Sequence, residues 1–188
     1  MKRIFLTLAI LANIALLSAF ILGWQIGDPM TAGGRDPEVN GRIGTHLLVG
    51  LGALTSATMV HALLFTYFMG TGRWIEETTH AYSLSSDWYR LNQRTKYGVL
   101  PGICISFLLL VITGSLGAVA DPATAVTLQS TWGVSDATLH FAAAVGTWLV
   151  NMMVNMTQYF AISRNSAIVE GVLAEVRRIR VEKGLPVD

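Results

Sequence analysis

Residues 43–72 of the chain read IGTHLLVGLGALTSATMVHALLFTYFMGTG and contain no Asp, Glu, Lys or Arg. A helix needs about 20 mostly apolar residues to cross the hydrocarbon core of a bilayer, so this stretch predicts a transmembrane helix with length to spare. It also carries two histidines, His46 and His61. Ionisable residues are rare inside a membrane, so both are candidates for a functional role.

Three further stretches have the same composition, at residues 4–27, 97–120 and 137–163. The segments between the four stretches contain turn-forming residues, among them Pro29, Pro122 and Gly133. Only 13% of the chain is charged, against about a quarter in a typical soluble domain. The sequence therefore predicts an all-α fold, an integral membrane four-helix bundle over residues 1–163 followed by a tail over residues 164–188.

The first stretch follows Lys2 and Arg3, as the core of a signal peptide would. Its apolar run is longer than such a core and ends without a convincing cleavage site, so we expect a retained anchor helix. Two of the 13 Lys and Arg residues, Arg35 and Arg42, lie on one side of the predicted spans, and the other eleven lie on the opposite side. The positive-inside rule then predicts a multi-pass protein of the inner (cytoplasmic) membrane with both termini in the cytoplasm.

Two cytoplasmic segments are predicted to be helical. In the 73–96 loop, Ser85 or Ser86 can cap a short helix that lies on the membrane surface. In the tail, residues 164–183 include apolar residues at helical spacing opposite charged ones, which predicts an amphipathic helix. Both segments are candidate contact surfaces for a partner subunit of a membrane complex. No basic face predicts nucleic-acid binding, and no internal repeat is evident.

Polar and small residues at helical spacing mark one face of the second and fourth spans. In the fourth span they are His140, Ala144, Thr147, Asn151, Asn155 and Gln158, and in the second they are His46, Gly50, Ala53 and Ala57. Both spans run in the same direction, and each begins three residues before its first histidine. His46 and His140 are therefore predicted to lie at the same depth, and His61 and Asn155 at a second matched depth.

Two histidines at one depth on parallel helices are suited to bind one haem iron axially, and Gly50 and Ala53 leave room beside His46 for the macrocycle. This pattern over residues 4–163 resembles four-helix membrane b-type cytochromes. It also resembles one half of haem A synthase, through Thr113-Gly-Ser-Leu-Gly-Ala118 followed by a loop and a histidine. The resemblance implies haem b as cofactor, His46 and His140 as its metal ligands, and electron transfer with a quinone or a partner redox protein.

Two departures from these families narrow the prediction. Asn155 stands where a histidine would complete a second haem pair with His61, so we expect one haem and an interhelical hydrogen bond between His61 and Asn155. Ile43 stands where the haem A synthase halves carry an acidic residue, so that activity is not expected. The alternative is a haem-free accessory or assembly subunit, whose histidines only form hydrogen bonds and whose loop and tail contact the partner.

Overall fold

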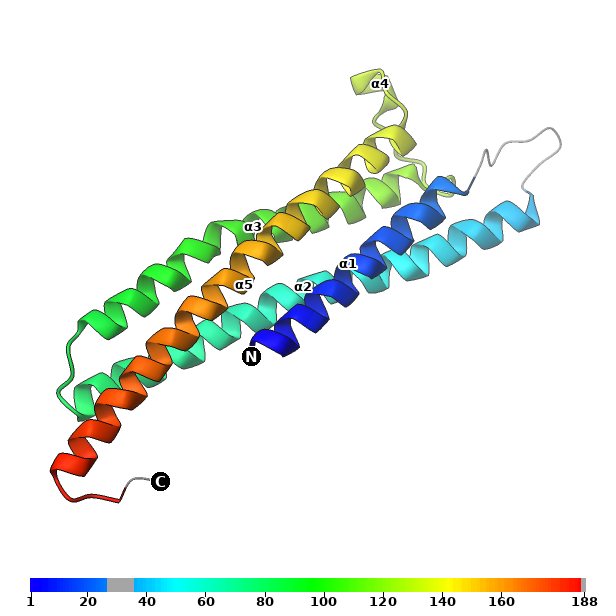
Figure 1. Ribbon diagram of the computed structural model, residues 1–188. Helices are drawn as coiled ribbons and strands as arrows, with labels where there is room; N and C mark the ends of the chain where they lie inside the picture. Colours follow the sequence, from blue (N-terminus) through cyan, green and yellow to red (C-terminus); the bar gives the residue numbers. More distant parts are fainter. Residues whose placement is uncertain (27–35, 187–188) are drawn as a thin grey trace.

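The computed structural model describes residues 1–26 and 36–186 and confirms an all-α fold (Figure 1). The long helices are α1 (Lys2–Trp24), α2 (Pro37–Ala81), α3 (Asp87–Ala120) and α5 (Asp136–Glu182), and α4 (Gln129–Trp132) is a single turn. No strand occurs in the residues that the structure describes. By length and composition, α1, α2, α3 and α5 are each able to cross a membrane.

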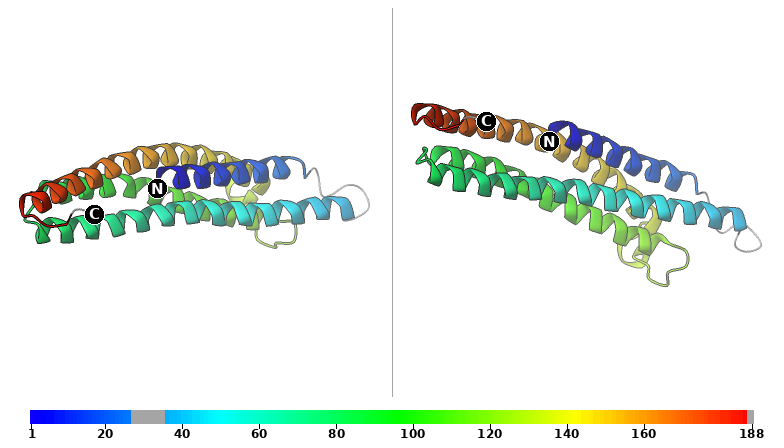
Figure 2. Two further views of the ribbon diagram at one scale, coloured as in Figure 1. Left: turned by 60° about the horizontal axis from the view of Figure 1, so that its bottom comes forward. Right: turned by 90° about the horizontal axis from the view of Figure 1, so that it is seen from below.

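The four long helices form an elongated bundle (Figure 2). The most extensive contacts join α1 to α2 and α3 to α5, and the ring is closed by contacts of α2 with α3 and of α1 with α5. Consequently α2 and α5 face each other across one diagonal of the bundle. The predicted parallel pair, the second and fourth spans, thus forms this diagonal, and both helices direct side chains towards the same interior.

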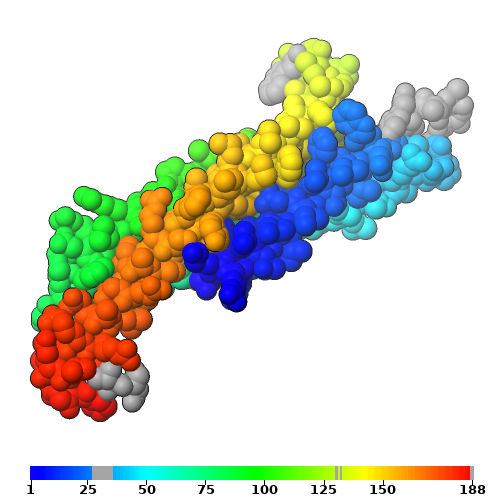
Figure 3. Space-filling view, in the orientation of Figure 1, coloured from blue at the N-terminus to red at the C-terminus, as the bar shows by residue number. Residues whose placement is uncertain are grey.

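The helix α1 is only half as long as its partners α2 and α5, with 23 residues against 45 and 47. Its first residue, Lys2, places Nζ 5.4 Å from the ring centroid of Tyr159, midway along α5. Beyond that level α2, α3 and α5 continue without α1 (Figures 1 and 3). We call this three-helix extension, residues 71–81, 87–96 and 165–182, the stalk. The opposite end of the bundle, which contains His46 and His140, is called the histidine end.

The stalk has a small apolar core of its own. Ile75, Ile168 and Val172 are buried in it, and aromatic side chains including Trp88 pack against them. Trp88 lies so close to Gly171 that a Cβ on this glycine would overlap the indole ring. The apolar face predicted for the tail is therefore covered by the chain's own α2 and α3.

A buried polar cluster joins the same three helices where the stalk meets the bundle. The Asn92 amide donates to Asn165 Oδ1 at 2.6 Å, and the Asn165 amide donates to Thr71 Oγ1 at 2.9 Å. Gly72 packs against this cluster, because a Cβ there would lie 2.9 Å from Asn92 Oδ1. Side-chain amides thus fix the relative positions of α2, α3 and α5 at this level.

The predicted interfacial helix in the 73–96 loop is wrong. A helix does begin at Asp87, whose backbone N–H donates to Ser85 Oγ, but it continues to Ala120 as part of α3. No glycine or proline separates Leu91 from Tyr97, so nothing interrupts the helix where the loop was expected to end. Likewise α5 runs through residues 163 and 164, so the tail is a direct continuation of the fourth span.

Replacing Gly171 by alanine should destabilise the stalk. The added methyl group would overlap the Trp88 ring, and overpacking of this kind costs about 1–3 kcal/mol. The thermal unfolding temperature of the detergent-solubilised Gly171→Ala variant is expected to fall. Gly146→Ala, on the same helix, is the control, because a Cβ at Gly146 meets no atom within 4 Å. Equal unfolding temperatures for the two variants would contradict the tight contact.

Candidate functional site

The structure brings His46 and His140 together, as the matched depths predicted. Their ring centroids lie 5.9 Å apart with an interplanar angle of 73°. Asp36 caps α2 ahead of Pro37, nine residues before His46, and Ser135 caps α5 ahead of Asp136, four residues before His140. The two imidazoles therefore meet although α2 begins five residues further from its histidine than α5 does.

Each of these histidines is held by a backbone carbonyl of a neighbouring helix. His46 Nδ1 lies 2.9 Å from the carbonyl oxygen of Ala19 on α1, and His140 Nδ1 lies 3.2 Å from that of Thr113 on α3. A carbonyl oxygen only accepts, so Nδ1 carries the proton and donates it in both rings. In the neutral imidazole the other nitrogen, Nε2, then keeps its lone pair. This is the arrangement in which a histidine binds a metal through Nε2.

A glycine lies against each imidazole and leaves space for it. A Cβ on Gly23 would be 2.8 Å from His46 Cε1, and a Cβ on Gly117 would be 3.0 Å from His140 Cε1. Each histidine follows its glycine by 23 residues and its carbonyl partner by 27. The hairpins α1–α2 and α3–α5 thus present their histidines in the same way. This repeat was not evident from the sequence, although the Leu-Gly pairs at 22–23 and 116–117 mark it.

The spacing of the two rings can be compared with that of two imidazoles bound to one metal ion. An imidazole nitrogen binds a first-row metal at about 2.0–2.1 Å, so two trans imidazoles place their ring centroids roughly 6.3 Å apart. The observed 5.9 Å is close to that value. A group of three or more His, Cys, Asp or Glu side chains suited to a metal does not occur among the described residues. A haem needs only two, because the porphyrin supplies the other four ligands.

The other two residues expected beside the macrocycle behave differently. A Cβ on Gly50 would meet no atom within 4 Å, so there is open space one turn from His46. Ala53 is buried in the apolar core and is packed on all sides. The absence of neighbours at Gly50 is shared with Gly44 and Gly52 on the same helix, and Ala53 forms part of the packed apolar layer.

The second histidine of α2 is fully buried in a hydrogen-bond network that crosses three helices. His61 Nε2 lies 2.9 Å from Asn151 Oδ1, and His61 Nδ1 lies 2.9 Å from the amide nitrogen of Gln158. Nε2–H therefore donates to Asn151, and Nδ1 accepts from Gln158. The Asn151 amide in turn donates to Asn13 Oδ1 at 3.1 Å, and Asn13 donates to the Ala9 carbonyl at 2.7 Å. Both nitrogens of His61 are occupied.

The predicted hydrogen bond between His61 and Asn155 is wrong in its partner. Asn155 lies between Asn151 and Gln158 on α5, but neither atom of its amide group has a partner, although the residue is only 7% exposed. The sequence pattern gave the correct depth for this residue and the wrong pairing, because residues one turn on either side reach His61 instead. It also missed Asn13, the single amide in α1, which closes the network from the third helix.

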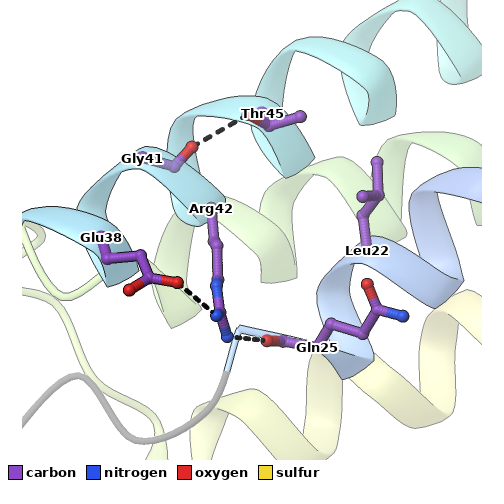
Figure 4. Close-up of a pocket in the computed structure, with 6 residues that line it drawn as sticks. All are labelled: Leu22, Gln25, Glu38, Gly41, Arg42 and Thr45. Carbon is purple, nitrogen blue, oxygen red and sulfur yellow. Dashed lines mark hydrogen bonds and ion pairs between the residues drawn. The ribbon is translucent and has the colours of Figure 1, made fainter.

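A surface pocket of about 770 Å³ lies at the histidine end, between the last turn of α1 and the first turns of α2 (Figure 4). Its lining includes Leu22, Gln25 and Thr45. Arg42 crosses the pocket, donating to the Gln25 carbonyl at 3.1 Å and to the Glu38 carboxylate at 2.6 Å. Arg42 and Thr45 lie four residues and one residue before His46 on α2, and the lining includes neither His46 nor His140.

Comparison with protein-family models, with curated proteins and with solved structures finds no match to this chain. The assignment of a function therefore rests on the residues and geometry described above.

The polar network gives a prediction that separates two neighbouring asparagines on α5. Asn151→Leu leaves the buried His61 Nε2–H and the part-buried Asn13 Oδ1 without partners, at a cost of about 1–3 kcal/mol. Asn155→Leu removes an amide that has no partner, so it should leave the stability unchanged or raise it. Thermal unfolding of the two variants in the same detergent measures the difference. A loss of stability for Asn155→Leu as large as that for Asn151→Leu would show that Asn155 has a partner.

Proposed function

We propose that this chain is a multi-pass membrane protein that binds one b-type haem between α2 and α5, with His46 and His140 as axial ligands. The observation that carries the proposal is the paired fixation of the two imidazoles. Both rings donate Nδ1–H to a carbonyl of another helix and leave Nε2 free, and they are separated by roughly the width of one liganded iron.

The chain's own residues prepare this site for the cofactor. The carbonyls of Ala19 and Thr113 fix the tautomer and orientation of the imidazoles and make them better ligands. Gly23 and Gly117 admit the rings close to the backbone, and the space at Gly50 accepts an edge of the macrocycle. When bound, the haem supplies one-electron redox chemistry, with a potential set by these ligands and their hydrogen bonds.

We further propose that the bound haem exchanges electrons with a quinone or a partner redox protein. The distribution of Lys and Arg supports a location in the inner membrane with both termini and the stalk in the cytoplasm. In that orientation the histidine end is at the opposite surface. The haem would then be accessible from that surface and from the adjacent half of the bilayer.

A haem-free accessory or assembly subunit is the second candidate, and the stalk favours it. Three helices continue well beyond α1 as an ordered unit, at the end of the bundle far from the histidine pair. Electron transfer at the histidine end does not require such an extension. Residues 73–96 and 164–183 carry charged side chains on its outer surface, where a partner subunit would bind. Loss of a co-purifying partner on deletion of the chain after Arg164, from a colourless protein, would favour this function.

The haem proposal predicts a Soret band in the purified protein that shifts when dithionite is added. His46→Ala and His140→Ala should each abolish the six-coordinate spectrum, because each removes one axial ligand. His61→Ala is the matched control. It is 15 residues from His46 on the same helix, or about 22 Å along the axis, and should leave the spectrum unchanged. The proposal fails if the wild-type protein is colourless, or if both ligand variants retain its spectrum.

A further inference from the structure

We infer that Arg42 binds a haem propionate, so that the pocket between α1 and α2 at the histidine end is the carboxylate-binding part of the site. The inference rests on the proposed haem function and adds to it the orientation of the cofactor. The propionate edge of the haem would point out of the bundle at the histidine end, and the opposite edge would point towards the apolar core at Ala53.

The position of Arg42 on α2 and its positive charge both support its assignment as the propionate-binding residue. It precedes His46 by four residues, which places it one helical turn further out on nearly the same face of α2. Among the residues that the structure describes, it is the only Lys or Arg at the histidine end, since the others lie in the stalk, at its edge or at the start of α1. A carboxylate placed beside the histidines therefore meets one cation in this part of the structure.

The equivalent position on α5 cannot serve in this way. Asp136 precedes His140 by the same four residues, but it is an acid, and both of its oxygens are used. Oδ1 accepts from the Leu128 backbone N–H at 2.9 Å, and Oδ2 accepts from Thr127 Oγ1 at 2.6 Å. The two hairpins are thus alike at the histidines and opposite in charge one turn outside them. Among the described residues, a haem bound there would find a cation for its carboxylates on the side of Arg42 alone.

Arg42 has the capacity to bind a further carboxylate. A guanidinium has five N–H donors, and the structure shows Nη1 donating to the Gln25 carbonyl and Nη2 donating to Glu38. The contact with Gln25 holds the side chain across the end of α1 (Figure 4). Glu38 is 73% exposed and competes weakly, because exposed pairs of this kind contribute little to stability. A propionate can therefore bind beside Glu38 or replace it.

The test measures haem loss from the full-length protein in detergent. Protein is reconstituted either with haem b or with its dimethyl ester, which lacks the propionate charges, and the haem is then captured by an excess of a haem-scavenging protein. Arg42→Gln should accelerate the loss of haem b by about 3- to 10-fold and leave the loss of the ester unchanged. Glu38→Gln should slow the loss of haem b, because it removes the competing carboxylate. Arg73→Gln, which breaks a similar exposed pair with Glu77 in the stalk, should change neither rate.

The outcomes separate this inference from the proposed function. A wild-type protein that takes up neither cofactor overturns both. A wild-type protein that takes up haem, with identical rates of loss for Arg42→Gln and wild type, overturns the role of Arg42 alone. An equal effect of Arg42→Gln on haem b and on the ester also overturns it, because the contact would then not involve a propionate. Should Arg42→Gln not fold, the wild-type protein alone provides the test, because equal rates of loss for haem b and for its dimethyl ester reject the inference.

Discussion

The absence of water inside a bilayer is the constraint on which the interior of this bundle depends. A buried polar group there must find its partner within the protein. The polar stripe of α5 meets this requirement almost completely. His140 pairs with a carbonyl of α3, Thr147 with Thr113, and Asn151 with His61 and Asn13. Each of these bonds joins two different helices, so the pattern of partners also fixes how the helices are packed.

The same constraint explains how far the sequence predicted the fold. Four charge-free stretches and the period of the polar residues were sufficient to identify the long helices and the central pair. Depth could be predicted because helical rise is constant along two parallel spans. Partners could not, because a side chain reaches residues one turn away in either direction, as His61 does with Asn151 and Gln158. The length of α3 was missed because polar residues 92–97 suit a helix in water as well as a loop.

His46 and His61, both on α2, show that hydrogen-bond partners, more than depth, decide which imidazole is suited to a cofactor. His46 uses one nitrogen, towards Ala19, and retains the lone pair of the other. His61 uses both nitrogens, towards two side chains of α5, and has none left for a metal. A sequence shows two histidines at helical spacing but does not show this difference. One sequence signal distinguishes His46 from His61. A glycine stands 23 residues before His46, as it does before His140, and no glycine stands 23 residues before His61.

The difference in hydrogen bonding between His46 and His61 gives a reason why the bundle would bind one haem, at the level of His46, and none at the level of His61. At the histidine level the two hairpins are alike, and the diagonal between α2 and α5 holds two imidazoles. At the second level His61 faces Asn151 and Gln158, and three helices are tied together through Asn13. The side-chain amides thus join helices across the diagonal at the level of His61, as a bound haem would at the level of His46 and His140. The Asn155 amide has no partner in this arrangement, because both ring nitrogens of His61 already form hydrogen bonds with Asn151 and Gln158.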